Sequence, residues 1–189
     1  MNAKGSISRV EPIRDMKKLG EMKDYLKEKN PRDYLMFVLG INTGLRISDL
    51  LELTVEGVKD GKVSVRETKT KKVREFSLSD TCMKTIKWYL RKTGLTHGTL
   101  FPSTENKEHA ISTRQAWHVL KKAADYVGIT ENVGTHSMRK TFGWYHYRSG
   151  VSIGYLQSCF NHSSPAVTMR YIGITQDELN DKVYLKSNL

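Results

Sequence analysis

The sequence contains little cysteine and no long hydrophobic run. Its two cysteines, Cys82 and Cys159, lie far apart and outside any CxxC or Cys/His cluster, which argues against a zinc site or a disulfide framework. No apolar stretch approaches the roughly 20 residues of a transmembrane helix, and the first residues lack the apolar core of a secretory signal. We therefore expect a cytoplasmic protein that binds neither a metal nor a membrane.

The sequence also has fewer acidic than basic residues. Of 189 residues, 31 are Lys or Arg and 20 are Asp or Glu, so the formal net charge is +11. Such a basic balance is typical of nucleic-acid-binding domains. A generally basic soluble protein, or one attracted to an anionic membrane, has the same composition, so charge alone favours nucleic acid only weakly.

The hydrophobic pattern predicts an α+β fold that is mainly helical, with one small antiparallel β-hairpin. Residues 62–66 and 73–78 have the composition of strands, and the basic turn 69–72 joins them. Capping residues and apolar spacing of 3 to 4 positions predict the helices. These begin near residues 15, 31, 48, 79, 112, 136, 152 and 164, and a last amphipathic helix spans 175–185.

The length suits one domain with its own core. We expect a flexible arm over residues 1–13 and a single domain over 14–189, because no linker, repeat or low-complexity tract divides the chain.

Two basic motifs stand out as candidate phosphate-binding sites. His136 and Arg139 are three residues apart in the first turn of a predicted helix, where they share a face and the helix dipole favours an anion. Arg46 lies in a Thr-Gly-Leu-Arg turn between apolar neighbours, where a buried charge needs a partner or an anion. The alternatives are a surface HxxR pair and a structural Arg46–Asp49 ion pair.

The predicted hairpin concentrates positive charge. Lys69 lies in its turn, and five further cations accompany it: Lys62, Arg66, Lys71, Lys72 and Arg74. A basic hairpin can follow a DNA groove and neutralise phosphates, so we interpret these five as DNA-binding residues. The alternative is a solvated turn that prevents edge-to-edge strand pairing.

A histidine and a tyrosine complete the set. His162 precedes a helix that Ser164-Pro165 begins, and Tyr171 follows it by nine residues. A tyrosine nucleophile must lose a proton despite its pKa near 10, so it needs a phosphate already neutralised by cations and a group that accepts the proton. Alone, each residue is more often structural, but together the six form a metal-free set for phosphoryl transfer.

In the order and spacing of these residues, the chain resembles the tyrosine recombinases, a family that includes phage integrases, Xer-type recombinases and fimbrial invertases. The resemblance runs from about residue 15 to the C-terminus. It implies a catalytic set that matches the family's motifs: Arg46, Lys69, His136, Arg139, His162 and Tyr171, the last being the nucleophile.

The resemblance implies site-specific DNA recombination through a 3′-phosphotyrosyl intermediate, without ATP, metal or other cofactor. It also implies double-stranded DNA as the partner and a homotetramer on DNA, with a monomer possible in its absence. The N-terminal DNA-clamping domain of typical members, about a hundred residues long, is absent here, so the chain is expected to be a short natural recombinase or an excised catalytic domain. The alternatives are a DNA-binding regulator without cleavage activity and a type IB topoisomerase-like enzyme.

Overall fold

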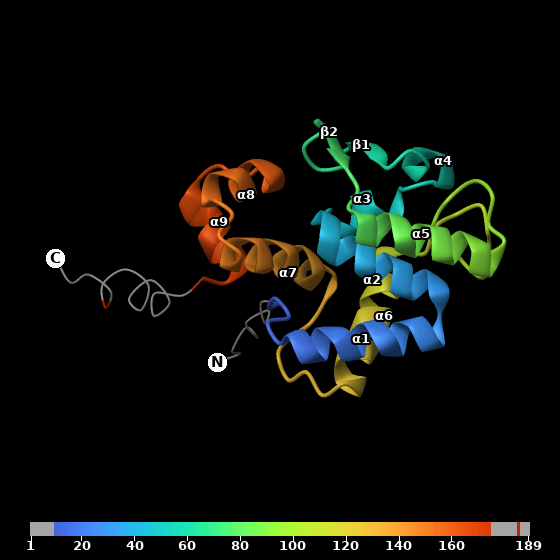
Figure 1. Ribbon diagram of the computed structural model, residues 1–189, viewed down its shortest axis with the longest axis horizontal. Helices are drawn as coiled ribbons and strands as arrows, with labels where there is room; N and C mark the ends of the chain where they lie inside the picture. Colours follow the sequence, from blue (N-terminus) through green and yellow to red (C-terminus); the bar gives the residue numbers. More distant parts are fainter. Residues whose placement is uncertain (1–9, 175–184, 186–189) are drawn as a thin grey trace, which may run out of the picture.

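The computed structural model describes residues 10–174 and Leu185. Its elements follow one another as helices around one hairpin (Figure 1). In chain order these are α1 (Met16–Lys29), α2 (Pro31–Thr43), α3 (Ile47–Leu51), α4 (Val55–Val58), β1 (Lys62–Arg66), β2 (Val73–Ser77), α5 (Asp80–Thr93), α6 (Thr113–Tyr126), α7 (Thr135–Arg148), α8 (Ile153–Phe160) and α9 (Pro165–Ile172). The predicted fold class, mainly helical with a small antiparallel sheet, is confirmed.

Helix α2 forms the centre of the core. Its sequence is apolar nearly all round, and Leu35, Phe37 and Leu39 are fully buried. A helix with this pattern must be covered on several sides, and α2 packs against α1, α3, α5, α6 and α7. The turn that follows α2 is thereby attached to the centre of the hydrophobic core.

The end of α2 is set by Gly44. Its left-handed backbone (φ 61°) is readily adopted only by glycine, and its N–H donates to the Gly40 carbonyl. The predicted C-cap is confirmed, and it turns the chain sharply so that Arg46 directly precedes α3.

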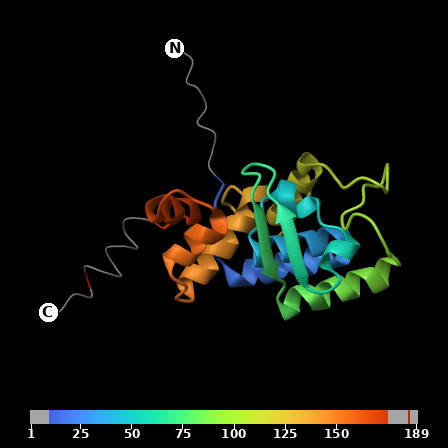
Figure 2. The same cartoon turned by 90° about the horizontal axis from the view of Figure 1, so that it is seen from above.

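The hairpin consists of β1 and β2 in antiparallel register, with Val65 opposite Arg74. Val63 and Val65 are buried in the core, whereas the alternate residues Lys62 and Arg66 are exposed. The predicted strand over 73–78 ends one residue earlier. Seen from above, the turn of the hairpin extends toward the α7–α9 end of the molecule (Figure 2).

Helices α8 and α9 pack on α7 as a second, smaller cluster (Figure 1). Leu156, Phe160 and Ile172 form its buried apolar centre. Gly143 of α7 allows this close approach, because a Cβ there would lie 2.6 Å from Ile172 and 2.7 Å from Phe160.

Most predicted caps are confirmed, including the capping box of Ser112 with Gln115. Two helix starts differ from the prediction, that of α3 by two residues and that of α7 by one. Helix α3 begins at Ile47 without a side-chain cap, so Ser48 is not its N-cap. Helix α7 begins at Thr135 because Ser137 Oγ accepts a hydrogen bond from the Gly134 N–H. The short helix α4 was not predicted.

The first described residues can be compared with the predicted N-terminal arm. The N–H of Ile13 donates to Thr141 Oγ1 at 2.8 Å, and Ile13 is buried, so the last residues of the expected arm pack on the domain. The predicted helix over 175–185 lies outside the described residues, Leu185 excepted. No helix of the described part of the chain is long and apolar enough to span a membrane.

Candidate active site

All six predicted catalytic residues line one open pocket of about 460 Å³. They belong to four segments: the α2–α3 turn, the hairpin turn, the start of α7, and the α8–α9 connection with α9. The wall consists of Arg46, Lys69, Thr70, His136, Arg139, Asn161, His162, Ser163, Val167 and Tyr171. Residues up to 125 positions apart in sequence thus form one strongly cationic cavity.

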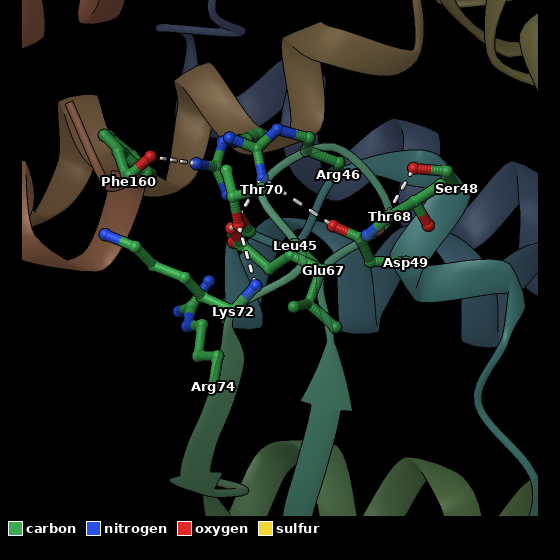
Figure 3. Close-up of polar contacts among 12 residues, drawn as sticks. Leu45, Arg46, Ser48, Asp49, Glu67, Thr68, Thr70, Lys72, Arg74 and Phe160 are labelled. Carbon is green, nitrogen blue, oxygen red and sulfur yellow. Dashed lines mark hydrogen bonds and ion pairs between the residues drawn. The ribbon is translucent and has the colours of Figure 1, made fainter.

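Arg46 is held by two buried carboxylates (Figure 3). Its Nη1 lies 3.0 Å from Glu67 Oε2 and 3.8 Å from Asp49 Oδ2. The Arg46–Asp49 pair proposed from the sequence therefore exists, but Glu67 is the closer partner. Asp49 also accepts a hydrogen bond from the Thr68 N–H at 2.9 Å, which ties α3 to the hairpin turn.

Arg139 is almost fully buried (2% exposed) and connects two segments of the site. Its Nη1 donates to the Gly44 carbonyl, and its Nη2 donates to the Phe160 carbonyl at 2.9 Å. The guanidinium also lies 4.5 Å from the centre of the Phe160 ring. Burial, with the charges of Arg46 and Arg74, lowers the pKa of Arg139 to about 10, although Tyr171 and Glu67 act in the opposite direction. Arg139 therefore stays cationic at neutral pH.

His136 and Tyr171 face one another across the pocket. The His136 Nδ1 lies 3.4 Å from the Tyr171 Oη. Although solvent reaches the ring, partial burial and the charges of Arg139 and Lys140 lower the pKa of His136. The neutral imidazole therefore predominates at pH 7, and it can accept the tyrosine proton.

His162 is fixed by a threonine of α9. Its Nδ1 lies 3.1 Å from Thr168 Oγ1, and that hydroxyl donates to the Ser164 carbonyl. Since the hydroxyl has a single proton, Nδ1 is the donor to Thr168, and Nε2 is left for another partner. Burial and the charges of Arg139 and Arg46 lower the pKa of His162.

The hairpin turn closes over the pocket from the other side. Lys69 is exposed at its rim, and Lys72 Nζ donates to Asn161 Oδ1 at 3.2 Å. Asn161 caps α8 in a left-handed conformation (φ 54°) between Phe160 and His162. The turn is therefore in contact with the segment that carries His162.

The five cations predicted to bind DNA fall into two groups. Lys62, Arg66 and Lys71 are exposed on the hairpin, as is Lys72 despite its bond to Asn161. Arg74 is half-buried, and its Nη2 donates to the Thr43 carbonyl at 3.0 Å. Its guanidinium therefore makes a structural contact between the hairpin and the end of α2.

Sequence reasoning missed several residues of the site. Glu67, an acid among the hairpin cations, is buried beside Arg46. Its position as an acidic residue in a basic segment was the one sequence feature that could have indicated a role in the site. Nothing in the local sequence indicated Thr168, which bonds His162, or Lys140, whose Nζ lies 5.5 Å from the centre of the Tyr171 ring.

The fold and the pocket together define the class of the tyrosine recombinases. Residues 14–178 match the model of the phage integrase family, and the chain belongs to this family. It is 43% identical over 169 residues to the probable integrase/recombinase YoeC of Bacillus subtilis, covering 89% of this chain and 92% of that protein. It is 29% identical to the tyrosine recombinase XerA of Pyrococcus furiosus, covering 89% of this chain but 58% of that protein. The chain thus spans little more than half the length of this Xer relative.

Solved structures share the fold at lower sequence identity. A crystal structure of the XerA recombinase matches with a TM-score of 0.76 at 20% identity, covering 100% of this chain and 67% of that one. The XerH recombinase bound to its palindromic difH substrate, in a post-cleavage complex, matches with a TM-score of 0.74 at 16% identity, covering 93% and 53%. The catalytic domain of bacteriophage HP1 integrase matches with a TM-score of 0.62 at 22% identity, covering 95% and 98%.

Proposed function

We propose that this chain is a site-specific recombinase that breaks and rejoins double-stranded DNA through a 3′-phosphotyrosyl intermediate. The observation that carries the proposal is the pocket itself, in which the Tyr171 hydroxyl lies 3.4 Å from a histidine nitrogen and shares one wall with two arginines. A phosphodiester placed there meets a nucleophile, a proton acceptor and several cations at once.

In the proposed first step, Tyr171 Oη attacks the scissile phosphorus while His136 Nδ1 accepts the phenolic proton. The bond from phosphorus to the 5′-oxygen breaks, and Lys69 Nζ gives that oxygen a proton. Arg46 and Arg139 donate to the non-bridging oxygens, where negative charge develops, and this electrostatic stabilisation is commonly the largest single contribution to the rate.

His162 is proposed to donate from Nε2 to a non-bridging oxygen. Its Nδ1 proton is committed to Thr168, so Nε2 carries a proton only in the imidazolium form. The lowered pKa of His162 applies to the free site, and the negative charge of a bound phosphate favours protonation. In the second step, a 5′-hydroxyl attacks the phosphotyrosine and releases Tyr171, so the phosphodiester is restored without ATP.

The exposed cations of the hairpin are proposed to bind phosphates beside the cleavage point: Lys62, Arg66, Lys71 and Lys72. Assembly as a homotetramer on DNA, with a monomer in its absence, is part of the proposal and rests on the family resemblance. A cytoplasmic location agrees with the two free cysteines, Cys82 and Cys159.

The test is covalent trapping on nicked DNA. Duplex fragments from the source genome are nicked near each potential site so that the 5′-hydroxyl is lost after cleavage, and the protein–DNA adduct is detected on a denaturing gel. We expect an adduct with the wild-type protein and with Tyr155→Phe, whose hydroxyl is exposed on α8, and none with Tyr171→Phe. Salt-sensitive DNA binding without any adduct would contradict the proposal and favour a DNA-binding regulator.

A further inference from the structure

Glu67 is a buried acid in the most basic part of the molecule. It directly follows Arg66, the last residue of β1, and its side chain is 3% exposed. Burial by itself raises the pKa of a carboxyl group, but a hydrogen bond from Thr70 and the charges of Arg46 and Arg139 leave the pKa of Glu67 below its ordinary value. Glu67 is therefore a carboxylate, and it contacts two residues of the pocket wall, Arg46 and Thr70.

Two contacts of this carboxylate join separate parts of the site (Figure 3). Its Oε2 lies 3.0 Å from Arg46 Nη1 and accepts a hydrogen bond from Thr70 Oγ1 at 2.6 Å. Arg46 comes from the α2–α3 turn, whereas Thr70 is the neighbour of Lys69 in the hairpin turn.

The backbone of the same residue closes the turn. The Glu67 N–H donates to the Lys72 carbonyl at 2.9 Å, and the Glu67 carbonyl accepts from the Lys71 N–H at 2.8 Å. Lys69 therefore lies in a loop that is held at its base by the Glu67 backbone and from within by the Glu67 carboxylate.

A carboxylate at this place has a cost. It offsets part of the positive charge that would attract a phosphate, and burying it requires desolvation that an ion pair only partly offsets. Its benefit must lie in geometry, since small displacements of groups that contact the reacting atoms strongly reduce rates.

We propose that Glu67 is a positioning residue, which orients the guanidinium of Arg46 toward the phosphate and, through Thr70, fixes the turn that presents Lys69. The inference rests on the proposed strand-cleavage function. In this proposal one carboxylate positions both Arg46, which stabilises the phosphate, and Lys69, which protonates the leaving oxygen.

Two variants separate the two contacts. Glu67→Gln keeps the shape and an acceptor for Thr70 but removes the charge that pairs with Arg46. Thr70→Val removes only the hydroxyl and leaves the Arg46–Glu67 pair in place. The matched control is Glu75→Gln, which removes the same charge from an exposed position on β2.

The measurements are the single-turnover cleavage rate at saturating DNA, the DNA dissociation constant and the thermal midpoint of each variant. We expect Glu67→Gln to cleave about ten- to a hundredfold more slowly than Glu75→Gln, with the two dissociation constants similar. Equal rates for Glu67→Gln and Glu75→Gln would overturn the inference.

A second substrate tests the link to Lys69. Sulfur in place of the bridging 5′-oxygen leaves as a thiolate, whose conjugate acid has a pKa near 8.5, so departure no longer needs an acid. On this substrate we expect Thr70→Val to cleave at the wild-type rate. Glu67→Gln should still cleave much more slowly than the wild type. The link from Glu67 through Thr70 to Lys69 would be overturned if Thr70→Val lowered the cleavage rate equally on both substrates, or lowered it on neither.

The outcomes also separate this inference from the proposed function. If the wild-type protein forms no adduct, the proposed function fails and the inference fails with it. If the wild type cleaves and Glu67→Gln cleaves as fast as its control, only the inference fails. Should Glu67→Gln be unfolded at the assay temperature, the Thr70→Val comparison on the two substrates decides.

Discussion

The Nδ1 of His136 lies 3.4 Å from the hydroxyl of Tyr171, although the two residues belong to different helices and stand 35 positions apart. Helix α7 presents the histidine in its first turn, and α9 presents the tyrosine near its end. The contact exists because α9 packs closely on α7 beside Gly143.

The cleavage rate is expected to fall on the acid side of neutrality. Burial and surrounding cations lower the pKa of His136 below its usual 6.5, so the folded protein keeps the ring neutral at pH 7 and protonates it only at lower pH. Protonation removes the acceptor for the Tyr171 proton. In the DNA-free protein, NMR titration should give a His136 midpoint below 6.5, and single-turnover cleavage should slow as the pH falls through the acidic range.

The variant His136→Gln, with His97→Gln as its control, tests whether His136 causes the slower cleavage at acidic pH. Removing the base in His136→Gln should slow cleavage by about 10²- to 10⁴-fold and abolish the part of the pH dependence due to this ring. His97, in the loop that follows α5, is not among the residues that line the pocket. Its replacement should leave the cleavage rate and its pH dependence unchanged. A His136 midpoint at or above 6.5 would contradict the prediction.

Gly143→Ala should destabilise the protein and slow cleavage. Its Cβ would lie 2.6 Å from Ile172 and 2.7 Å from Phe160, so α9 must move, at a cost of about 1–3 kcal/mol. The control is Gly20→Ala in α1, where an added Cβ meets no described atom within 4 Å beyond its chain neighbours and its own helix backbone; it should stabilise the helix by about 1 kcal/mol. Urea unfolding of both variants gives the free energies, and equal shifts would refute the packing argument.

Arg74 and Lys62 should behave differently when replaced by methionine. Arg74→Met loses the bond to the Thr43 carbonyl, and we expect a loss of about 1.5–3 kcal/mol in the free energy of unfolding. Lys62→Met, on the exposed face of β1, should change stability by less than about 0.5 kcal/mol and lower the slope of log affinity against log salt by about 0.9. An Arg74→Met protein of normal stability that shows only a reduced salt slope would contradict this division.

The sequence predicted much of the fold because its signals are local. Gly44 requires a left-handed turn, Ser112 and Gln115 cap their helix within four residues, and the alternation at 62–66 indicates a strand. The start of α7 was misplaced by one residue because Ser137 bonds back to the Gly134 N–H, and this reversed cap lacks the usual capping residue.

The site divides in the same way. The sequence by itself determined the types and order of the six residues that line the pocket, since HxxR spacing, the Thr-Gly-Leu-Arg turn and a tyrosine nine positions after a histidine are visible in the chain. Only the tertiary structure decided their partners: Glu67 for Arg46, Thr168 for His162, and two backbone carbonyls for Arg139. The physical reason is that a buried charge or polar group takes its partner from whatever the packing of distant segments brings within hydrogen-bonding distance, and sequence spacing carries no record of that packing.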